Sequence, residues 1–199
     1  MDYRSKTVVL TLSGDYITLD AWQQKYGLPV GSDQIGKHFS LKESRFRRDI
    51  EEFGKLIVCE PLMIVADKAR ELWGRPISFS SFNRTEKKQA ELREDPDTRH
   101  LRAETSPHVV KMAADVNLAT RADVMAFVPQ LRLAADQVHV MIRIGYKEYL
   151  KQSEIEEKAT GKKDAWTFVH FDVCPEYFRK GRILHSDPHP IPWEFECVW

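Results

Sequence analysis

The sequence lacks the features that mark several classes of protein. It has only three cysteines among 199 residues, widely spaced and without a CxxC pair. Such an odd, scattered set argues against a disulfide framework and a thiolate zinc site, so Cys59, Cys174 and Cys197 are expected to be buried or incidental thiols. No apolar run is long enough for a membrane span or the core of a signal peptide. We therefore expect no transmembrane segment and no visible export signal.

Net charge is absent as well. The 30 Lys and Arg residues balance the 30 Asp and Glu residues. A neutral chain has no overall field to attract nucleic acid, an anionic membrane or another polyanion, so we expect no nucleic-acid partner. The chain also contains no HExxH sequence, no GxSxG elbow and no glycine-rich phosphate loop. These absences argue against a gluzincin-type protease, a serine hydrolase and a phosphate-loop enzyme.

What the chain does have is enough apolar sequence for one ordinary domain. Of its residues, 42% are hydrophobic and 30% are charged, which is typical of a globular chain that buries a core. We predict an N-terminal accessory strand and helix over residues 1–36 and a main domain over 37–175. Prolines and aromatic residues over 176–199 indicate a C-terminal arm packed on that domain.

Hydrophobic periodicity and end signals predict both helices and strands. Helices are expected at 18–26, from a capping box at 40–43 towards Gly54, at 61–73, at 85–93, after a second capping signal at 120–123, and within a Lys- and Glu-rich stretch at 146–165. Strands are expected at 7–13, 76–82, 113–118, 137–145 and 167–173. The predicted fold class is α+β, with an antiparallel sheet of about four main strands, helices against one face and a zinc cleft on the other.

Two stretches contain residues suited to metal binding. SPHVVKMAAD places His108 and Asp115 around a short turn that enters a strand, and TFVHFDV places His170 within another strand. Strand side chains alternate, so His170 and Asp172 share the face opposite the apolar residues. A catalytic zinc ion takes three protein ligands and leaves a fourth position for water. Two imidazoles and one carboxylate meet that requirement.

The spacing alone leaves a second interpretation open. In a chain with seven histidines, a surface histidine and a carboxylate at a strand end also arise by chance. A metal ion is favoured because a carboxylate buried beside imidazoles costs several kcal/mol unless it is paired or bound to metal. His139, in the strand predicted at 137–145, is more simply a structural histidine. The stretch from His185 to His189 is more simply a polar loop.

The same residues resemble a family of cell-wall peptidases. The zinc D-alanyl-D-alanine carboxypeptidases and L-alanyl-D-glutamate endopeptidases, which share a fold with the hedgehog signalling domain, have the signature Ser-x-His-x-x-Gly-x-Ala-x-Asp followed by a strand histidine. Ser106, His108, Ala113 and Asp115 match that signature, and FVHFDV around His170 is similar to the second part. The resemblance runs from about residue 38 to residue 173.

The resemblance implies a zinc site and a substrate-binding arginine. His108, Asp115 and His170 correspond to the zinc ligands of the family. Arg84, in the stretch SFNRT, corresponds to the arginine that holds a substrate carboxylate or carbonyl, a task suited to a planar guanidinium.

The sequence departs from the family pattern at two positions. Lys111 stands where the family has glycine, and Thr167 stands where some relatives carry the proton-handling carboxylate. A proton carrier is still required for hydrolysis. Asp172 is our first candidate for that role, and Asp164 in the preceding loop is the second.

The sequence thus predicts a zinc-dependent peptidase that cleaves peptidoglycan stem peptides or cross-links, as a carboxypeptidase or an endopeptidase. Its place of action would be the bacterial cell wall, periplasmic or extracellular, with phage encoding and host lysis as one route to it. The alternative is a non-catalytic, zinc-stabilised module that binds the cell wall or forms part of a phage structure. Neither the bond cleaved nor the oligomeric state follows from the sequence.

Overall fold

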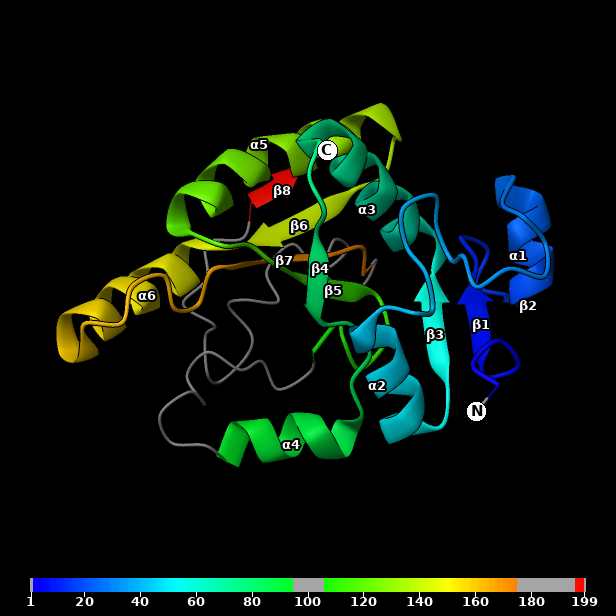
Figure 1. The fold of residues 1–199 in the computed structure, drawn as a ribbon, viewed down its shortest axis with the longest axis horizontal. Helices are drawn as coiled ribbons and strands as arrows, with labels where there is room; N and C mark the ends of the chain where they lie inside the picture. Colours follow the sequence, from blue (N-terminus) through cyan, green and yellow to red (C-terminus); the bar gives the residue numbers. More distant parts are fainter. Residues whose placement is uncertain (1, 95–105, 175–195, 199) are drawn as a thin grey trace.

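The chain folds into two sheets and six helices among the residues described here (Figure 1). The computed structural model describes residues 2–94, 106–174 and 196–198, with only the backbone of the last three. Residues 95–105 and most of the predicted arm therefore lie outside the described residues. No described helix has both the length and the apolar character needed to cross a bilayer.

The larger sheet has five strands in the order β4-β5-β7-β6-β8, and every neighbouring pair is antiparallel. The strands are β4 (Ser78–Ser81), β5 (Ala113–Asn117), β6 (Ile142–Gly145), β7 (Phe168–Asp172) and β8 (Glu196–Val198). The first four are those predicted from the sequence, and β8 adds an edge from the C-terminal segment. This arrangement confirms the predicted α+β class.

Two long helices, α3 (Glu60–Trp73) and α5 (Arg121–Gln137), pack together over this sheet (Figure 1). Helix α3 has proline in its first turn and ends at Gly74, whose φ of 68° is the left-handed conformation that favours glycine. Helix α5 begins at Thr120, whose hydroxyl accepts the N–H of Asp123 as predicted. Both sequence signals therefore place a helix end correctly.

The core lies between these helices and the apolar face of the sheet. In β7, Val169 and Phe171 are fully buried in this core, whereas His170 and Asp172 point to the other face. The predicted alternation in this strand therefore separates the core from the polar residues of the candidate site.

A smaller sheet joins the N-terminal segment to the rest of the chain. Strand β1 (Thr7–Leu10) pairs antiparallel with β2 (Tyr16–Thr18) and parallel with β3 (Leu56–Cys59). Helix α1 (Leu19–Tyr26) starts at its Thr18 cap and ends at Gly27, as the sequence indicated. Strand β3 was not predicted. It is a run of four buried residues immediately before α3.

The remaining helices match their predictions in part. Helix α2 (Ser44–Phe53) begins later than the capping box implied: the Glu43 carboxylate accepts the Ser40 N–H, but the Ser40 hydroxyl accepts the N–H of Lys42 in a turn before the helix. Helix α4 (Glu86–Glu94) follows the Thr85 cap, and α6 (Lys147–Thr160) occupies the Lys- and Glu-rich stretch.

The prediction of a strand over 137–145 was wrong in its first half. Helix α5 continues to Gln137, and the chain then turns through His139, which has a φ of 54° and is exposed. Its side chain is thus not part of the sheet. Of the three cysteines, Cys59 and Cys174 are buried free thiols, as expected.

Candidate metal centre

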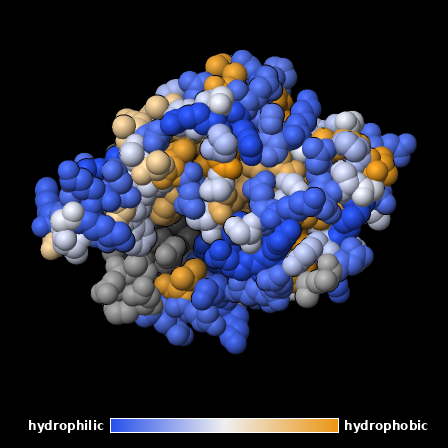
Figure 2. Space-filling model, viewed as in Figure 1, coloured by the Kyte–Doolittle hydropathy of each residue, from blue (hydrophilic) through white to orange (hydrophobic). Residues whose placement is uncertain are grey.

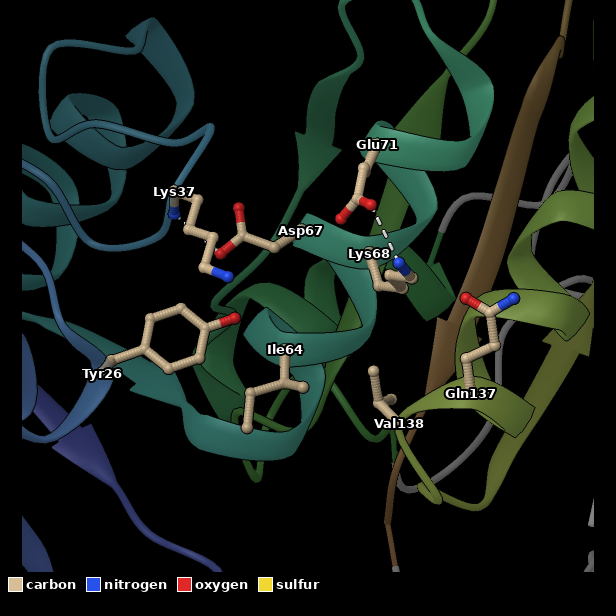
Figure 3. A pocket seen from close by; sticks show the side chains of 8 residues that line it. All are labelled: Tyr26, Lys37, Ile64, Asp67, Lys68, Glu71, Gln137 and Val138. Carbon is tan, nitrogen blue, oxygen red and sulfur yellow. Dashed lines mark hydrogen bonds and ion pairs between the residues drawn. The ribbon is translucent and has the colours of Figure 1, made fainter.

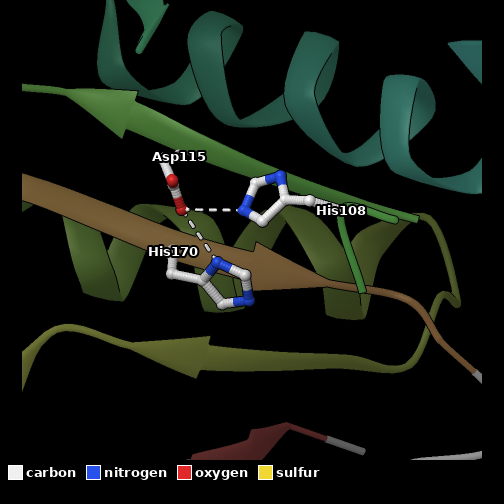
Figure 4. Close-up of side chains that lie close together, drawn as sticks. All are labelled: His108, Asp115 and His170. Atoms are coloured by element: carbon white, nitrogen blue, oxygen red, sulfur yellow. Dashed lines mark hydrogen bonds and ion pairs between the residues drawn. The ribbon is translucent and has the colours of Figure 1, made fainter. Parts of the chain in front are cut away.

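Three side chains that are distant in sequence meet on the polar face of the larger sheet (Figure 4). Asp115 and His170 are directly opposite each other in the pairing of β5 with β7, and His108 lies on the turn that leads into β5. All three are buried, and one ligand atom from each lies within 4.8 Å of the others. The structure brings together the residues that the sequence proposed as ligands.

The carboxylate of Asp115 is at the centre of the group. Its Oδ1 lies 3.2 Å from Nε2 of His108 and 2.8 Å from Nδ1 of His170. Burial alone would raise the pKa of Asp115, but the two histidines hold it well below its usual value. Asp115 is therefore an anion when folded, which is the form that ligates a metal.

The far side of each imidazole fixes its tautomer. Nδ1 of His108 lies 2.8 Å from the carbonyl oxygen of Phe82, and Nε2 of His170 lies 3.3 Å from the carboxylate of Asp172. Both partners are acceptors, so each of these ring nitrogens carries a hydrogen and donates it. The nitrogen of each ring that faces Asp115 donates a hydrogen to it when the ring is protonated, and would offer a lone pair to a metal that replaced that hydrogen.

The anionic carboxylate of Asp115 and the two ring nitrogens that face it need a proton or a metal cation among them. A proton serves this purpose in the protein alone: burial lowers the pKa of both imidazoles, but hydrogen bonds and charge from Asp115 and Asp172 raise that of His170 overall. For His108 burial prevails, and its pKa is lowered. A divalent metal satisfies all three donors at once, so the residues fit a metal ion.

A tight turn positions His108. The N–H of Val109 donates to the carbonyl of Ser106, that of Lys111 to His108, and that of Met112 to Pro107. Lys111 has a φ of 67°, a conformation that favours glycine. The turn therefore has a left-handed backbone at a position that carries a lysine.

Lys111 is half-buried rather than fully solvated. Its ammonium group donates to the carbonyl oxygen of Arg84, while the N–H of Arg84 donates to the carbonyl of His108. Burial lowers the pKa of Lys111. These bonds tie the turn that carries His108 to the segment that carries Arg84.

Arg84 is buried close to this turn. Its guanidinium donates to Gln89 at 2.7 Å, to the hydroxyl of Ser81 at 3.0 Å and to that of Ser106 at 3.4 Å. These contacts hold the side chain in one orientation beside the ligands, as a substrate-positioning role requires.

Asn83 and Asp49, which the sequence analysis did not single out, support the Arg84 segment. The side chain of Asn83 accepts the N–H of Ile57 at 2.8 Å and donates to its carbonyl at 2.9 Å. Its own N–H donates to the fully buried carboxylate of Asp49. In the sequence, these residues are marked only as polar residues next to apolar segments. That pattern does not indicate which distant residues they contact.

Asp172 lies behind His170 and is fully buried. Arg143 donates to it through Nε at 3.0 Å and Nη2 at 2.7 Å, and the N–H of Cys174 donates at 3.2 Å. Burial opposes ionisation, but the bond from His170 and the charge of Arg143 lower the pKa of Asp172. These contacts indicate that Asp172 is an ionised carboxylate whose role is to orient His170.

Arg143 is buried as well. It is directly opposite Asp172 in the pairing of β6 with β7. Opposite charges on two predicted strands were the signal that could have revealed this pair.

Asp164, the second candidate for proton transfer, and Thr167 both form hydrogen bonds away from the three proposed ligands. Asp164 accepts the N–H of Arg121 at the start of α5, at 2.9 Å. Thr167 donates its hydroxyl to the carbonyl of Leu118, at 2.8 Å. His185 and His189 lie outside the described residues.

A groove of about 340 Å³ adjoins Asp115. Its walls come from α2, β4, α4 and the segment that enters β7, and they are formed by Arg45, Arg48, Glu52, Phe53, Ser80, Ser81, Asn83, Arg84, Lys88, Leu92, Asp115, Trp166 and Phe168. The groove therefore gives a ligand access to one of the proposed metal ligands and to Arg84.

A second cavity, of about 460 Å³, lies away from this group (Figure 3). Tyr26, Ile64 and Val138 are among its lining residues, together with the carboxylate of Asp67. That carboxylate accepts the N–H groups of Lys37 and His38 and so closes a loop. Two of its other polar side chains, Lys68 and Glu71, pair with each other at 2.9 Å.

No protein-family model and no curated protein matches this sequence. Among solved structures, the chain is similar to the L-Ala D-Glu endopeptidase ChiX of Serratia marcescens, with 21% sequence identity and a TM-score of 0.43. The match covers 69% of this chain and 96% of that one. This is a distant relation in fold.

Proposed function

We propose that the protein is a zinc-dependent peptidase that hydrolyses peptide bonds in peptidoglycan stem peptides or cross-links. The observation that carries the proposal is the convergence of His108 and His170, each of which turns one ring nitrogen to the buried carboxylate of Asp115 and the other to an acceptor. Three such donors suit catalytic zinc, which keeps a fourth position open. Where the enzyme acts, the bacterial cell wall, is part of the same proposal.

The surrounding residues supply what hydrolysis requires of the protein. His108, Asp115 and His170 would hold the ion, which when bound polarises a carbonyl group and activates water. Arg84, fixed by Gln89 and Ser81, positions the substrate through its carboxylate or carbonyl oxygen. Asp172 keeps the ring of His170 in the tautomer that binds metal.

Proton transfer requires a carboxyl group that faces the substrate. Among the described residues that line the groove, Glu52 and Asp115 are the carboxylates, and Asp115 is a proposed ligand. We therefore add Glu52 to Asp172 and Asp164 as a candidate proton carrier. A Glu52→Gln variant that keeps zinc but loses turnover would assign this role to Glu52.

A non-catalytic zinc module is the second candidate. It is favoured by two observations: Thr167 stands at the carboxylate position of some relatives, and Asp172 is paired with Arg143. Products separate the two candidates, because only the enzyme releases fragments from peptidoglycan, and their masses distinguish a carboxypeptidase from an endopeptidase.

Replacing His108 tests the proposal. We expect His108→Ala to lose bound zinc, measured by elemental analysis, and to lose cleavage of purified peptidoglycan, measured by mass spectrometry. Zinc at 100 times its Kd should stabilise the wild type by about 2.7 kcal/mol and leave His108→Ala unchanged. His139→Ala is the matched control, since His139 is exposed outside the group. Full cleavage by His108→Ala would refute the proposal.

A further inference from the structure

The groove beside Asp115 is cationic although the chain as a whole is neutral. Its lining includes four cationic side chains and two carboxylates, namely Arg45, Arg48, Arg84 and Lys88 against Glu52 and Asp115. Asp115 is a proposed ligand, so a bound metal would offset its charge. On the face shown in Figure 2, the surface over α4 and the adjoining part of α2 is mostly hydrophilic. A groove with this charge favours an anionic ligand.

Two of the four cations already have carboxylate partners. Arg45 pairs with the buried Asp49 and donates to the carbonyl of Ser80 at 3.1 Å. Lys88 pairs with Glu91 at 3.2 Å, within its own helix. Their charge contributes to the field of the groove, but their hydrogen-bonding groups are partly engaged.

Arg48 differs from these residues. It is exposed and forms no ion pair or hydrogen bond with any described residue. It follows Arg45 by three residues and precedes Glu52 by four, so all three lie on the same face of α2 and border the groove. A planar guanidinium with its donors available at the wall of a groove is suited to binding a carboxylate.

Arg47, the residue before Arg48 in α2, does not line the groove. Arg47 lies on another face of α2, with its guanidinium 5.6 Å from the centre of the Tyr3 ring. The groove also has apolar walls, from Phe53, Leu92, Trp166 and Phe168. Its ligand should therefore combine carboxylates with apolar groups, as an acidic peptide does.

Resting on the proposed peptidase function, we propose that the groove selects acidic peptides and that Arg48 is a specificity-determining residue. Arg48 binds a carboxylate of the substrate other than the group held by Arg84. An acidic side chain or a free C-terminus in the stem peptide provides such a carboxylate. Amidation of that carboxylate would remove the interaction and leave the scissile bond unchanged.

The test compares a stem tetrapeptide that has free carboxylates with the same peptide in which they are amidated. Binding is measured by calorimetry on protein stripped of metal, so that no turnover occurs. We expect the wild type to bind the acid about three to ten times more tightly than the amide, a preference that decreases as salt is added. Arg48→Ala should lose most of this preference.

Two further variants sharpen the result. Arg48→Lys should retain part of the preference, because it keeps the charge but not the planar fork. Arg47→Ala is the matched control and should bind both peptides as the wild type does. Thermal unfolding of each variant shows that its fold is intact.

The proposal is overturned if Arg48→Ala keeps the wild-type ratio of affinities, or if the wild type binds both peptides equally or neither. Failure of the peptidase function gives a different result. If the protein binds the acidic peptide selectively but the zinc-loaded protein does not hydrolyse it, the peptidase function is refuted and the acidic-peptide groove stands. If the zinc-loaded protein hydrolyses the peptide but Arg48→Ala keeps the wild-type ratio of affinities, the peptidase function stands and the role of Arg48 does not.

Discussion

At the scale of single residues, the partners of Asp172 decide its role. It receives hydrogen bonds from Arg143 and contacts the ring nitrogen of His170 that points away from Asp115. A carboxylate in this position raises the basicity of a ligand histidine and fixes its orientation. Its contribution should therefore appear in metal affinity rather than in proton transfer.

Asp172→Asn tests this role. We expect zinc affinity to fall by about 10- to 100-fold and turnover to recover at saturating zinc. The variant also removes the carboxylate charge that pairs with the buried Arg143, which should lower the free energy of unfolding. Competition with a chelator gives the affinity, and urea denaturation gives the stability. Normal affinity with lost turnover would instead make Asp172 the proton carrier.

Lys111 combines an unfavourable backbone with a favourable side-chain contact. Its φ of 67° costs a residue with a Cβ about 1–2 kcal/mol, while its ammonium group ties the turn to Arg84. Lys111→Ala keeps the first effect and removes the second. Lys111→Gly removes both.

We therefore expect Lys111→Gly to be more stable than Lys111→Ala by about 1 kcal/mol in urea denaturation. Both variants should bind the substrate less well than the wild type, because the Arg84 segment loses one attachment. If alanine and glycine gave equal stability, the left-handed backbone at this position would carry no cost.

The meeting of His108, Asp115 and His170 was predictable from the sequence because it depends largely on local patterns. Strand alternation placed His170 on the polar face, and the turn before β5 brought His108 close to Asp115. The pairing of Arg143 with Asp172 and the support of Asn83 by Asp49 were not predictable in the same way. They join residues 29 and 34 positions apart, so only the register of the strands and the packing of α2 define them.

At the scale of elements, a strained segment before β7 shapes the groove. Asp164 and Trp166 have φ values of 54° and 59°, and such strain costs about 1–3 kcal/mol at each residue. The indole N–H of Trp166 donates to Glu156 of α6 at 2.6 Å. Helix α6 thus holds the aromatic wall of the groove in place.

Glu156→Ala should release Trp166. Loss of this bond is worth about 1 kcal/mol, so we expect KM for a stem peptide to rise by about fivefold with a smaller change in kcat. Tryptophan fluorescence should shift as the ring becomes more exposed. Glu154→Ala, on an exposed position of the same helix, is the control. Unchanged KM and fluorescence would show that the segment holds itself in place.

The sequence predicted elements best where their ends carried chemical signals. Pro61 and Gly74 bounded α3, and Thr120 marked the start of α5. The alternating residues at 137–140 indicated a strand, but tertiary packing extended α5 through Gln137 and left a turn. Strand β3 has only four residues, too few for periodicity to separate a strand from the start of the next helix.

At the scale of the whole molecule, the N-terminal segment shares its core with the rest of the chain. Val9 and Trp22 belong to the same buried cluster as Phe171 of β7. The indole N–H of Trp22 donates to the carbonyl of Ile35, and β1 pairs along all of β3. Residues on both sides of the predicted boundary between 36 and 37 therefore contribute to one buried cluster.

Removal of residues 1–36 tests whether that segment is a separable accessory. Trp22→Ala alone should lower the free energy of unfolding by about 3–5 kcal/mol. That is a large part of the roughly 5–15 kcal/mol that stabilises a typical domain. Tyr16→Ala, at an exposed position, is the control and should cost little. We expect the shortened chain, which also exposes the edge of β3, to show no cooperative urea transition and no zinc binding. A shortened chain that unfolds cooperatively and binds zinc would establish 37–175 as an independent domain.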